Sequence, residues 1–232
     1  MENILECQNL VKFYPKCLAL NSVNLTVPKG KIVGLLGPNG SGKSTLIKLA
    51  NDLIQPTSGK ILIAGMEPGI ETKKIVSYLP ERTYLNDWMT VNDIIGFFAD
   101  FYQDFNKNKA YDMLARLGVN PSLRLKTMSK GTKEKVQLIL VMSREAQLYL
   151  LDEPIGGVDP AARDYILDTI IGNYNPEATV IISTHLIADV EKILDEVIFI
   201  NQGNIVLVST VDDIRENENK SVDALFREVF KC

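Results

Sequence analysis

The chain has 232 residues, of which 46% are hydrophobic, so it carries enough apolar side chains for one large domain with a packed core. Its formal net charge of −4 and its pI near 5.2 argue against a protein whose partner is nucleic acid, because phosphate binding requires a basic face. No apolar run reaches the roughly 18 to 20 residues of a membrane helix, and no export signal opens the sequence. We therefore expect neither a membrane span nor secretion.

The N-terminal 30 residues are typical of antiparallel strands. Segments 4–14 and 18–28 alternate between apolar and polar residues, and the segment 60–65 follows the turn "PTSG". We expect these three segments to form a side sheet.

Cys7, Cys17 and Cys232 are odd in number and lack metal-binding spacing, which indicates free thiols in a reducing, cytoplasmic compartment.

Four apolar runs rich in Ile, Val and Leu predict the buried strands of a mostly parallel sheet. Helical patterns follow three of them, and this alternation is an α/β signature. The predicted strands cover 31–37, 148–152, 179–184 and 196–200. The predicted helices cover 43–53, 160–172 and 186–195.

Residues 88–145 show helix signals only, which predicts an inserted helical subdomain that begins with a capping box at Thr90 and Asp93. The rest of the single domain, 1–87 and 146–215, would form the core with its antiparallel sheet. A second capping box at 210–213 opens a short helix, and "ENENK" predicts a polar, mobile tail over 216–232.

A phosphate-binding loop is the strongest motif. "GPNGSGKST" follows a predicted strand and precedes a predicted helix, as the P-loop pattern requires. Glycines let successive N–H groups point at phosphate oxygens, Lys43 reaches the β and γ phosphates, and the Ser44 hydroxyl ligates Mg²⁺. A glycine-rich turn with a surface lysine is disfavoured, because spacing and context agree. The predicted nucleotide-binding residues are Gly37, Pro38, Asn39, Gly40, Ser41, Gly42, Lys43, Ser44 and Thr45.

A pair of adjacent carboxylates ends the predicted strand 148–152. Both side chains can face the crevice at the carboxyl end of a parallel sheet. We assign Asp152 to Mg²⁺ and Glu153 to the attacking water, as in other P-loop enzymes. A solvated strand end would be the simpler explanation if the phosphate loop were missing. Asp159 is an expected helix N-cap before Pro160, which is a sufficient structural reason for both residues.

Four motifs in order resemble those of the nucleotide-binding subunit of an ABC transporter, and the resemblance covers roughly residues 1–215. They are the loop at 37–45, "LYLLDEP" at 148–154, "VDP" at 158–160 and "STH" at 183–185. The resemblance implies a P-loop NTPase core and a head-to-tail dimer that encloses two Mg·ATP. It also implies a separate integral membrane permease and a place at the inner face of the cell membrane.

The resemblance gives three further residues a role. Tyr14 matches the aromatic residue that stacks on adenine, although it could be an ordinary strand tyrosine. His185, the only histidine, matches the switch residue that contacts the γ phosphate and orients the attacking water. A lone histidine after a strand would otherwise be a satisfied structural residue. Asp159 joins the nucleotide-binding residues on the same basis.

Two motifs depart from the family pattern. The signature commonly reads Leu-Ser-Gly-Gly-Gln, whereas this chain has "MSKGT", in which Ser129, Lys130 and Gly131 are expected to meet the partner's γ phosphate. Ser129 could instead be a simple N-cap, and Lys130 could point to solvent. Glu81 stands where the family has a glutamine near Mg²⁺; it remains a suitable oxygen ligand but adds negative charge near Glu153.

Together these substitutions resemble bacterial exporters whose ATPase and permease are separate chains. We expect ATP hydrolysis by in-line attack of water, in a homodimer because one chain carries both half-site elements. The permease would dock near 81–98, where Trp88, Met89, Phe97 and Phe98 are candidate contacts or part of the subdomain's own core. One alternative is a soluble ABC-type ATPase that acts on ribosomes or DNA, and another is a module that closes on ATP without turnover.

Overall fold

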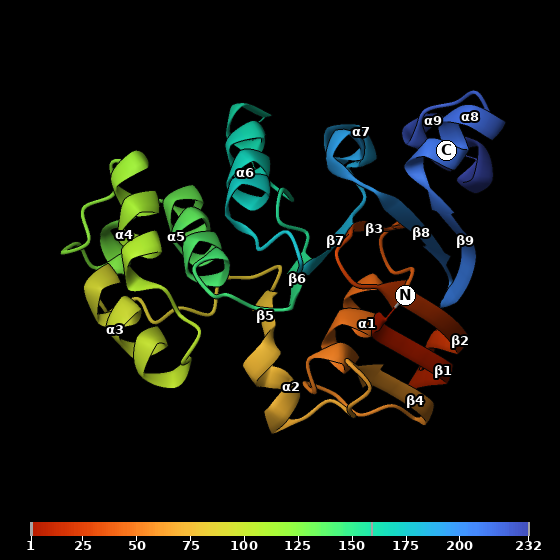
Figure 1. The fold of residues 1–232 in the computed structure, drawn as a ribbon, viewed down its shortest axis with the longest axis horizontal. Helices are drawn as coiled ribbons and strands as arrows, with labels where there is room; N and C mark the ends of the chain where they lie inside the picture. The colour runs from red at the N-terminus through yellow and green to blue at the C-terminus, as the bar shows by residue number, and fades with distance from the viewer. Residues whose placement is uncertain (1, 159, 232) are drawn as a thin grey trace.

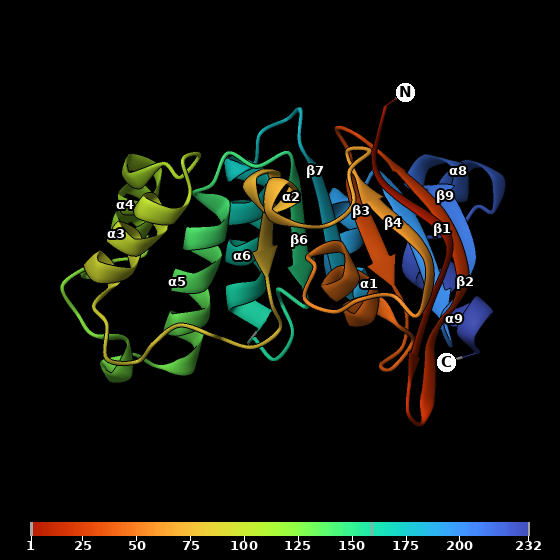
Figure 2. The same cartoon turned by 90° about the horizontal axis from the view of Figure 1, so that it is seen from below.

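A computed structural model describes residues 2–158 and 160–231 of the chain. Two sheets lie at one side of the molecule, and a group of helices lies at the opposite end (Figure 1). The view turned by 90° shows α6 between the central strands and these helices (Figure 2). The arrangement is the predicted α/β core with an antiparallel side sheet and an inserted helical part.

The central sheet has six strands in the order β5-β6-β7-β3-β8-β9, parallel apart from the antiparallel edge strand β9. Every residue of β3, β6 and β7 is buried, as expected for uninterrupted apolar runs that are covered on both faces. The four predicted strands are confirmed. The bounds are β3 (Ile32–Leu36), β5 (Val76–Leu79), β6 (Leu148–Asp152), β7 (Thr179–Thr184), β8 (Glu196–Asn201) and β9 (Asn204–Thr210).

The side sheet contains β1 (Asn3–Tyr14), β2 (Cys17–Pro28) and β4 (Ser58–Ile63), with β1 in the middle and both pairings antiparallel. In this register Leu5 lies opposite both Val27 and Ile63. Their side chains belong to one apolar cluster with residues of β3 and of the helix after it. The predicted side sheet is therefore confirmed, and its alternating pattern buries one face against the core.

Helices of 4 to 14 residues and a 3-10 turn complete the core. They are α1 (Lys43–Ala50), α2 (Ile70–Ile75), α6 (Pro160–Asn173) and α7 (Ile187–Val190), and η2 (Glu191–Ile193) is a 3-10 turn that continues α7. The first predicted helix is three residues shorter than expected, because its C-cap is Asn51. The segment predicted as one helix over 186–195 is divided into α7 and η2.

The inserted part contains α3 (Val91–Phe101), α4 (Lys107–Arg116), the 3-10 turn η1 (Leu125–Thr127) and α5 (Lys130–Met142). The predicted capping box is present, since the Asp93 N–H donates to Thr90 Oγ1 at 3.1 Å and the Thr90 N–H donates to Asp93 Oδ2 at 2.9 Å. Arg144, just after α5, donates to the Asp104 carboxylate and to the carbonyls of Val76 and Lys74. This buried side chain attaches the helices to the sheet.

The prediction of a polar, mobile tail over 216–232 was wrong. The capping box at 210–213 does open α8 (Val211–Asn217), but α9 (Val222–Phe230) follows it. Ser221 caps α9, and Val222 and Phe226 lie one turn apart on its buried face. Phe226 meets Phe199 of β8 edge-on, with the ring centroids 5.4 Å apart. Buried aromatic area holds a segment whose composition alone indicated disorder.

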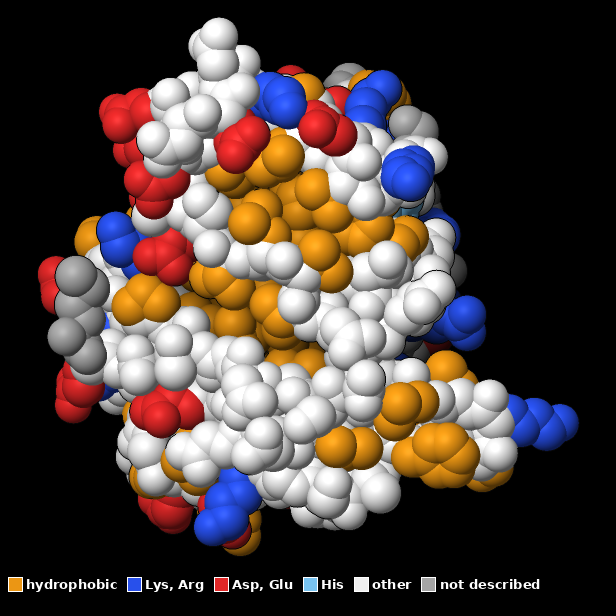
Figure 3. Space-filling model, turned by 90° about the vertical axis from the view of Figure 1, so that its right-hand side faces the viewer, with side chains coloured by type: hydrophobic (Ala, Val, Ile, Leu, Met, Phe, Trp, Pro, Cys, Tyr) orange, Lys and Arg blue, Asp and Glu red, His pale blue; other side chains and the backbone are white. Residues whose placement is uncertain are grey.

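Apolar surface remains exposed at the edge of the central sheet. The face over β9 and the C-terminal helices shows hydrophobic side chains gathered in a hollow (Figure 3). Val206 and Val208, both on β9, are 47% and 50% exposed. Over residues 2–158 and 160–231, none of the helices combines the length and the apolar character needed to cross a membrane.

Candidate functional site

A pocket of about 1060 Å³ lies beside the phosphate loop. Twelve of the predicted site residues line it, and they come from strands, loops and helices that are far apart in the sequence. They are Tyr14, Asn39, Gly40, Ser41, Gly42, Lys43, Ser44, Thr45, Glu81, Lys130, Glu153 and His185. Asp159 lies outside the described residues.

The loop between β3 and α1 requires glycine at two positions. A Cβ on Gly37 would come within 2.3 Å of the Ile200 carbonyl oxygen, so no larger side chain fits. Gly42 has φ +116°, a conformation that L residues rarely adopt, and it precedes the first residue of α1. These constraints place the N–H groups of the loop and the helix N-terminus beside the pocket, as anion binding requires.

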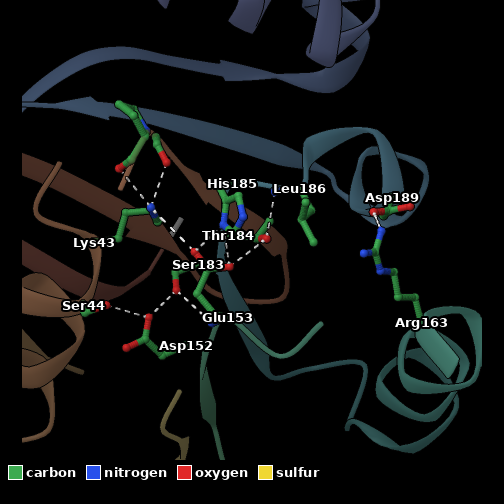
Figure 4. Close-up of polar contacts among 12 residues, drawn as sticks. Lys43, Ser44, Asp152, Glu153, Arg163, Ser183, Thr184, His185, Leu186 and Asp189 are labelled. Carbon is green, nitrogen blue, oxygen red and sulfur yellow. Dashed lines mark hydrogen bonds and ion pairs between the residues drawn. The ribbon is translucent and has the colours of Figure 1, made fainter. Parts of the chain in front are cut away.

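Lys43 is almost fully buried and points back over the loop (Figure 4). Its ammonium donates to the carbonyl oxygens of Gly37 at 2.7 Å and Pro38 at 3.2 Å, and it lies 3.7 Å from Glu153 Oε1. Burial lowers the pKa of Lys43 from its ordinary value, while the carboxylates of Glu153 and Asp152 act in the opposite direction. An anionic phosphate at this place would stabilise the charged form further.

Asp152 ends β6 beneath Ser44, with an exposed fraction of 2%. The hydroxyls of Ser44 and Ser183 both donate to its Oδ1, at 3.0 and 2.5 Å. Burial raises the pKa of Asp152 above its ordinary value, and the two hydroxyl hydrogen bonds oppose that shift. The parallel pairing of Asp152 with Ser183 across β6 and β7 explains how residues 31 positions apart meet.

Glu153 turns toward a different set of partners because its backbone has φ +50°, in the left-handed region. The Thr184 hydroxyl donates to its Oε2 at 3.1 Å, and His185 Nδ1 lies 3.1 Å from each carboxylate oxygen. Figure 4 shows that the two carboxylates have separate hydrogen-bond partners, although the Glu153 N–H donates to Ser183 Oγ at 3.2 Å. The strained turn therefore separates a carboxylate facing Ser44 from a carboxylate facing His185.

The oxygen atoms at this site fit a nucleotide with Mg²⁺. Ser44 Oγ and Asp152 Oδ1 are adjacent hard donors, and Glu81 lines the same pocket. Among the described residues, no group of three or more His, Cys, Asp or Glu side chains could hold a metal alone. Mg²⁺ normally keeps waters and phosphate oxygens beside one or two protein ligands, which agrees with this sparse set. Ser41 Oγ, buried beside the pocket, has no hydrogen-bond partner within the described residues.

Tyr14, Cys17 and Ala19 also line the pocket. Tyr14 is the last residue of β1, and the Lys12 ammonium lies 5.2 Å from its ring centroid. The Tyr14 side chain is partly exposed and lines the pocket, so part of its flat apolar ring is accessible there. This position fits a stacking residue.

Of the signature segment 128–132, one residue lines this pocket. Ser129 caps α5, since the Thr132 N–H donates to Ser129 Oγ at 3.2 Å. Lys130 lines the pocket, but Ser129 and Gly131 do not. A Cβ on Gly131 would meet no atom within 4 Å, so nothing in the described part of this chain requires glycine there.

Several residues at the site were not singled out from the sequence. Ser183 and Thr184 each bind one of the two carboxylates, and their place directly before His185 at the end of a predicted strand was the available signal. Cys17, Ala19, Arg82, Thr83, Lys133, Glu134, Gly156 and Gly157 also line the pocket. No residue pattern distinguishes these from ordinary surface positions, because only the fold brings them to the site.

Comparisons with known proteins agree with this site. A family model described as ABC transporter matches residues 20–156. The lantibiotic transport ATP-binding protein SrtF of Streptococcus pyogenes is 32% identical over 90% of this chain and 92% of its own length. An ABC transporter ATP-binding protein of Nostoc sp. is 30% identical over 88% of this chain, which spans 63% of that relative.

The same family appears among solved structures. One described as the ATP binding subunit of an ABC transporter has a TM-score of 0.87 and 31% identity, and the match covers 98% of this chain and 99% of that one. The residues matched by the family model, 20–156, include the phosphate loop and both carboxylates of this chain. The chain belongs to the ABC transporter family, as an ATP-binding subunit of the ATPase type.

Proposed function

We propose that this chain hydrolyses Mg·ATP in a homodimer and thereby drives solute transport, in the direction of export, through a separately encoded membrane permease. The observation that carries the proposal is the meeting of Lys43, Glu153 and His185 in one pocket next to the phosphate loop. ATP hydrolysis requires positioning and charge stabilisation more than covalent chemistry, and this pocket supplies both.

Each residue has a defined task in this proposal. The loop N–H groups and Lys43 bind the phosphates, and Glu153 accepts the proton of the attacking water. His185 and Thr184 orient the Glu153 carboxylate through the 3.1 Å contacts to its oxygens. Mg²⁺, held by Ser44, Asp152 and Glu81, would neutralise charge on the phosphates. Tyr14 would stack on the base, and Asp159 is retained as a nucleotide contact from the family resemblance.

The position of the signature segment supports the proposed dimer. Ser129 and Gly131, at the N-terminus of the 13-residue helix α5, do not line their own chain's pocket, although Lys130 between them does. Open space around Gly131 leaves room for a partner's nucleotide, and the helix N-terminus favours an anion. A head-to-tail arrangement would let the same segment of each subunit complete the other's site.

A second groove supports permease docking. It has a volume of about 440 Å³ between the sheet and the helical insert, and Arg82 lines both this groove and the nucleotide pocket. In the segment 81–98, Trp88 and Phe97 are 68% and 52% exposed, whereas Phe98 belongs to the helical core and lines this groove. We assign the exposed aromatics to the permease contact, and on this proposal the subunit would lie at the cytoplasmic face of the membrane.

The first test is the mass of Glu153→Gln in solution, measured by light scattering with and without Mg·ATP. This substitution keeps the shape of the side chain and removes the proposed base, so ATP should stay bound and convert monomer to dimer. Glu145→Gln is the matched control at an exposed position and should not accumulate a dimer. A Glu153→Gln protein that binds ATP but stays monomeric would contradict the homodimer.

A further inference from the structure

Gln137 is a buried polar residue of α5, with an exposed fraction of 2%. The Tyr84 N–H donates to its Oε1 at 3.3 Å, and its Nε2 donates to the Pro80 carbonyl at 3.4 Å. Buried amides need such partners, because an unpaired polar group in the interior costs free energy. Gln137 therefore contacts both ends of the loop 80–84, which contains Glu81.

Neighbouring turns of α5 bind the same stretch of chain. Lys133, one turn before Gln137, forms a 2.6 Å ion pair with Asp87 beyond the loop. The Ser77 hydroxyl, on the strand before the loop, donates to the carbonyl of Val141 at 2.9 Å, one turn after Gln137. The chain from β5 through the Glu81 loop thus follows one face of α5.

The same face begins at the signature serine. Lys133 and Gln137 are four residues apart on α5 and therefore lie on one side of the helix, and Ser129 is the N-cap residue four positions before Lys133. Ser129 caps the helix through the Thr132 N–H. At the other side of the loop, Glu81 lines the nucleotide pocket. One continuous helix therefore connects the loop that faces a chain's own nucleotide with the serine expected at the partner's nucleotide.

We propose that Gln137 is a positioning residue of the ATPase, which fastens the Glu81 loop to α5 so that a nucleotide-dependent shift of Glu81 moves Ser129. This inference rests on the proposed function. Gln137 does not line the nucleotide pocket, and its task is to make the loop and the helix move together. Without the two amide hydrogen bonds, Glu81 would still respond to the nucleotide, but the response would not reach the signature segment.

The test compares the parent protein with Gln137→Met, which keeps the length of the side chain and removes both hydrogen bonds. We expect the KM for ATP to stay within about twofold and kcat to fall by about fivefold or more, because nucleotide binding uses the chain's own pocket while turnover needs Ser129. Gln103→Met, the same substitution at an exposed position of the insert, is the control and should match the parent.

Trp88 gives an independent readout of the movement of α5, since it is the single tryptophan of the chain and follows Asp87, which forms an ion pair with Lys133 of that helix. In the Glu153→Gln background, ATP should change Trp88 fluorescence in the parent, and Gln137→Met should lose most of that change at equal ATP binding by calorimetry. If Gln137→Met fails to fold, Gln137→Asn provides the same comparison, because the shorter amide cannot reach both loop atoms.

The outcomes separate the two proposals. A parent protein without ATP turnover would overturn the proposed function itself. An active parent with an equally active Gln137→Met, or a variant whose loss is entirely in KM, would overturn only the positioning role. A kcat loss in Gln137→Met with unchanged KM and an unaffected Gln103→Met supports it.

Discussion

The Ser44 hydroxyl donates a 3.0 Å hydrogen bond to the Asp152 carboxylate, although 108 residues separate the two. Ser44 stands in the first turn of α1, and Asp152 ends the neighbouring strand β6. The contact joins the phosphate loop to the carboxylate that we assign to Mg²⁺. The Asp152 carboxylate is buried there, so its charged form lowers the stability of the folded protein.

Asp152→Asn is expected to make the nucleotide-free protein more stable than the wild type near neutral pH. Burial raises the folded pKa of Asp152 above its ordinary 3.8. The contribution of this raised pKa to the free energy of unfolding is fully present below 3.8, and it is lost as the pH rises through the folded pKa. Asparagine stays neutral and keeps an acceptor for both hydroxyls. The free-energy gain of the variant, measured by urea unfolding without Mg²⁺, should therefore grow from about pH 4 to about pH 7. A difference independent of pH would contradict this.

Tyr14→Ala should weaken ATP binding by about tenfold, because stacking on an aromatic ring contributes roughly 1 to 3 kcal/mol per base. Tyr14→Trp should retain affinity, since it preserves the flat apolar surface. Calorimetric titration of both variants measures the effect, with Tyr111→Ala on α4 as a control at a partly exposed tyrosine outside the pocket. Equal affinity in Tyr14→Ala and wild type would mean that Tyr14 is an ordinary strand residue.

Glu81→Gln should raise the affinity for ATP by a few fold. Glu81 and Glu153 both line the pocket. In surroundings open to solvent, the repulsion between one carboxylate and the phosphates weakens binding by about 1 kcal/mol, and the substitution removes it. The amide oxygen can still face Mg²⁺, so turnover should persist. Glu71→Gln, an equivalent change on the surface helix α2, should leave the dissociation constant unchanged. Weaker binding by Glu81→Gln would show that the carboxylate is an essential ligand.

Phe226→Ala should lower the free energy of unfolding by about 3 kcal/mol, because a buried ring that packs on Phe199 and Phe230 is replaced by a cavity. Phe101→Ala is the comparison, since that ring is 69% exposed and should cost less than about 1 kcal/mol. Chemical unfolding measures both. If Phe226→Ala behaved like Phe101→Ala, the C-terminal helix would not contribute to the stable core.

The sequence alone determined the parallel core, the side sheet and the phosphate loop, because uninterrupted apolar runs, alternating runs and a glycine spacing are local patterns. It also placed Asp152 and Glu153 at a strand end. It did not predict α9, because "ENENK" is polar and the favourable contact of Phe226 with Phe199 is a long-range one.

Only the tertiary structure decided how the parts of the site meet. The two carboxylates have separate partners because the backbone at Glu153 is left-handed. The amino-acid sequence does not show this backbone conformation. Gln137 looks like any polar residue in a helical stretch until the fold places Pro80 and Tyr84 against it. Sequence patterns record which residues prefer a strand, helix or turn, whereas contacts across more than 50 residues follow from the way sheets and helices pack.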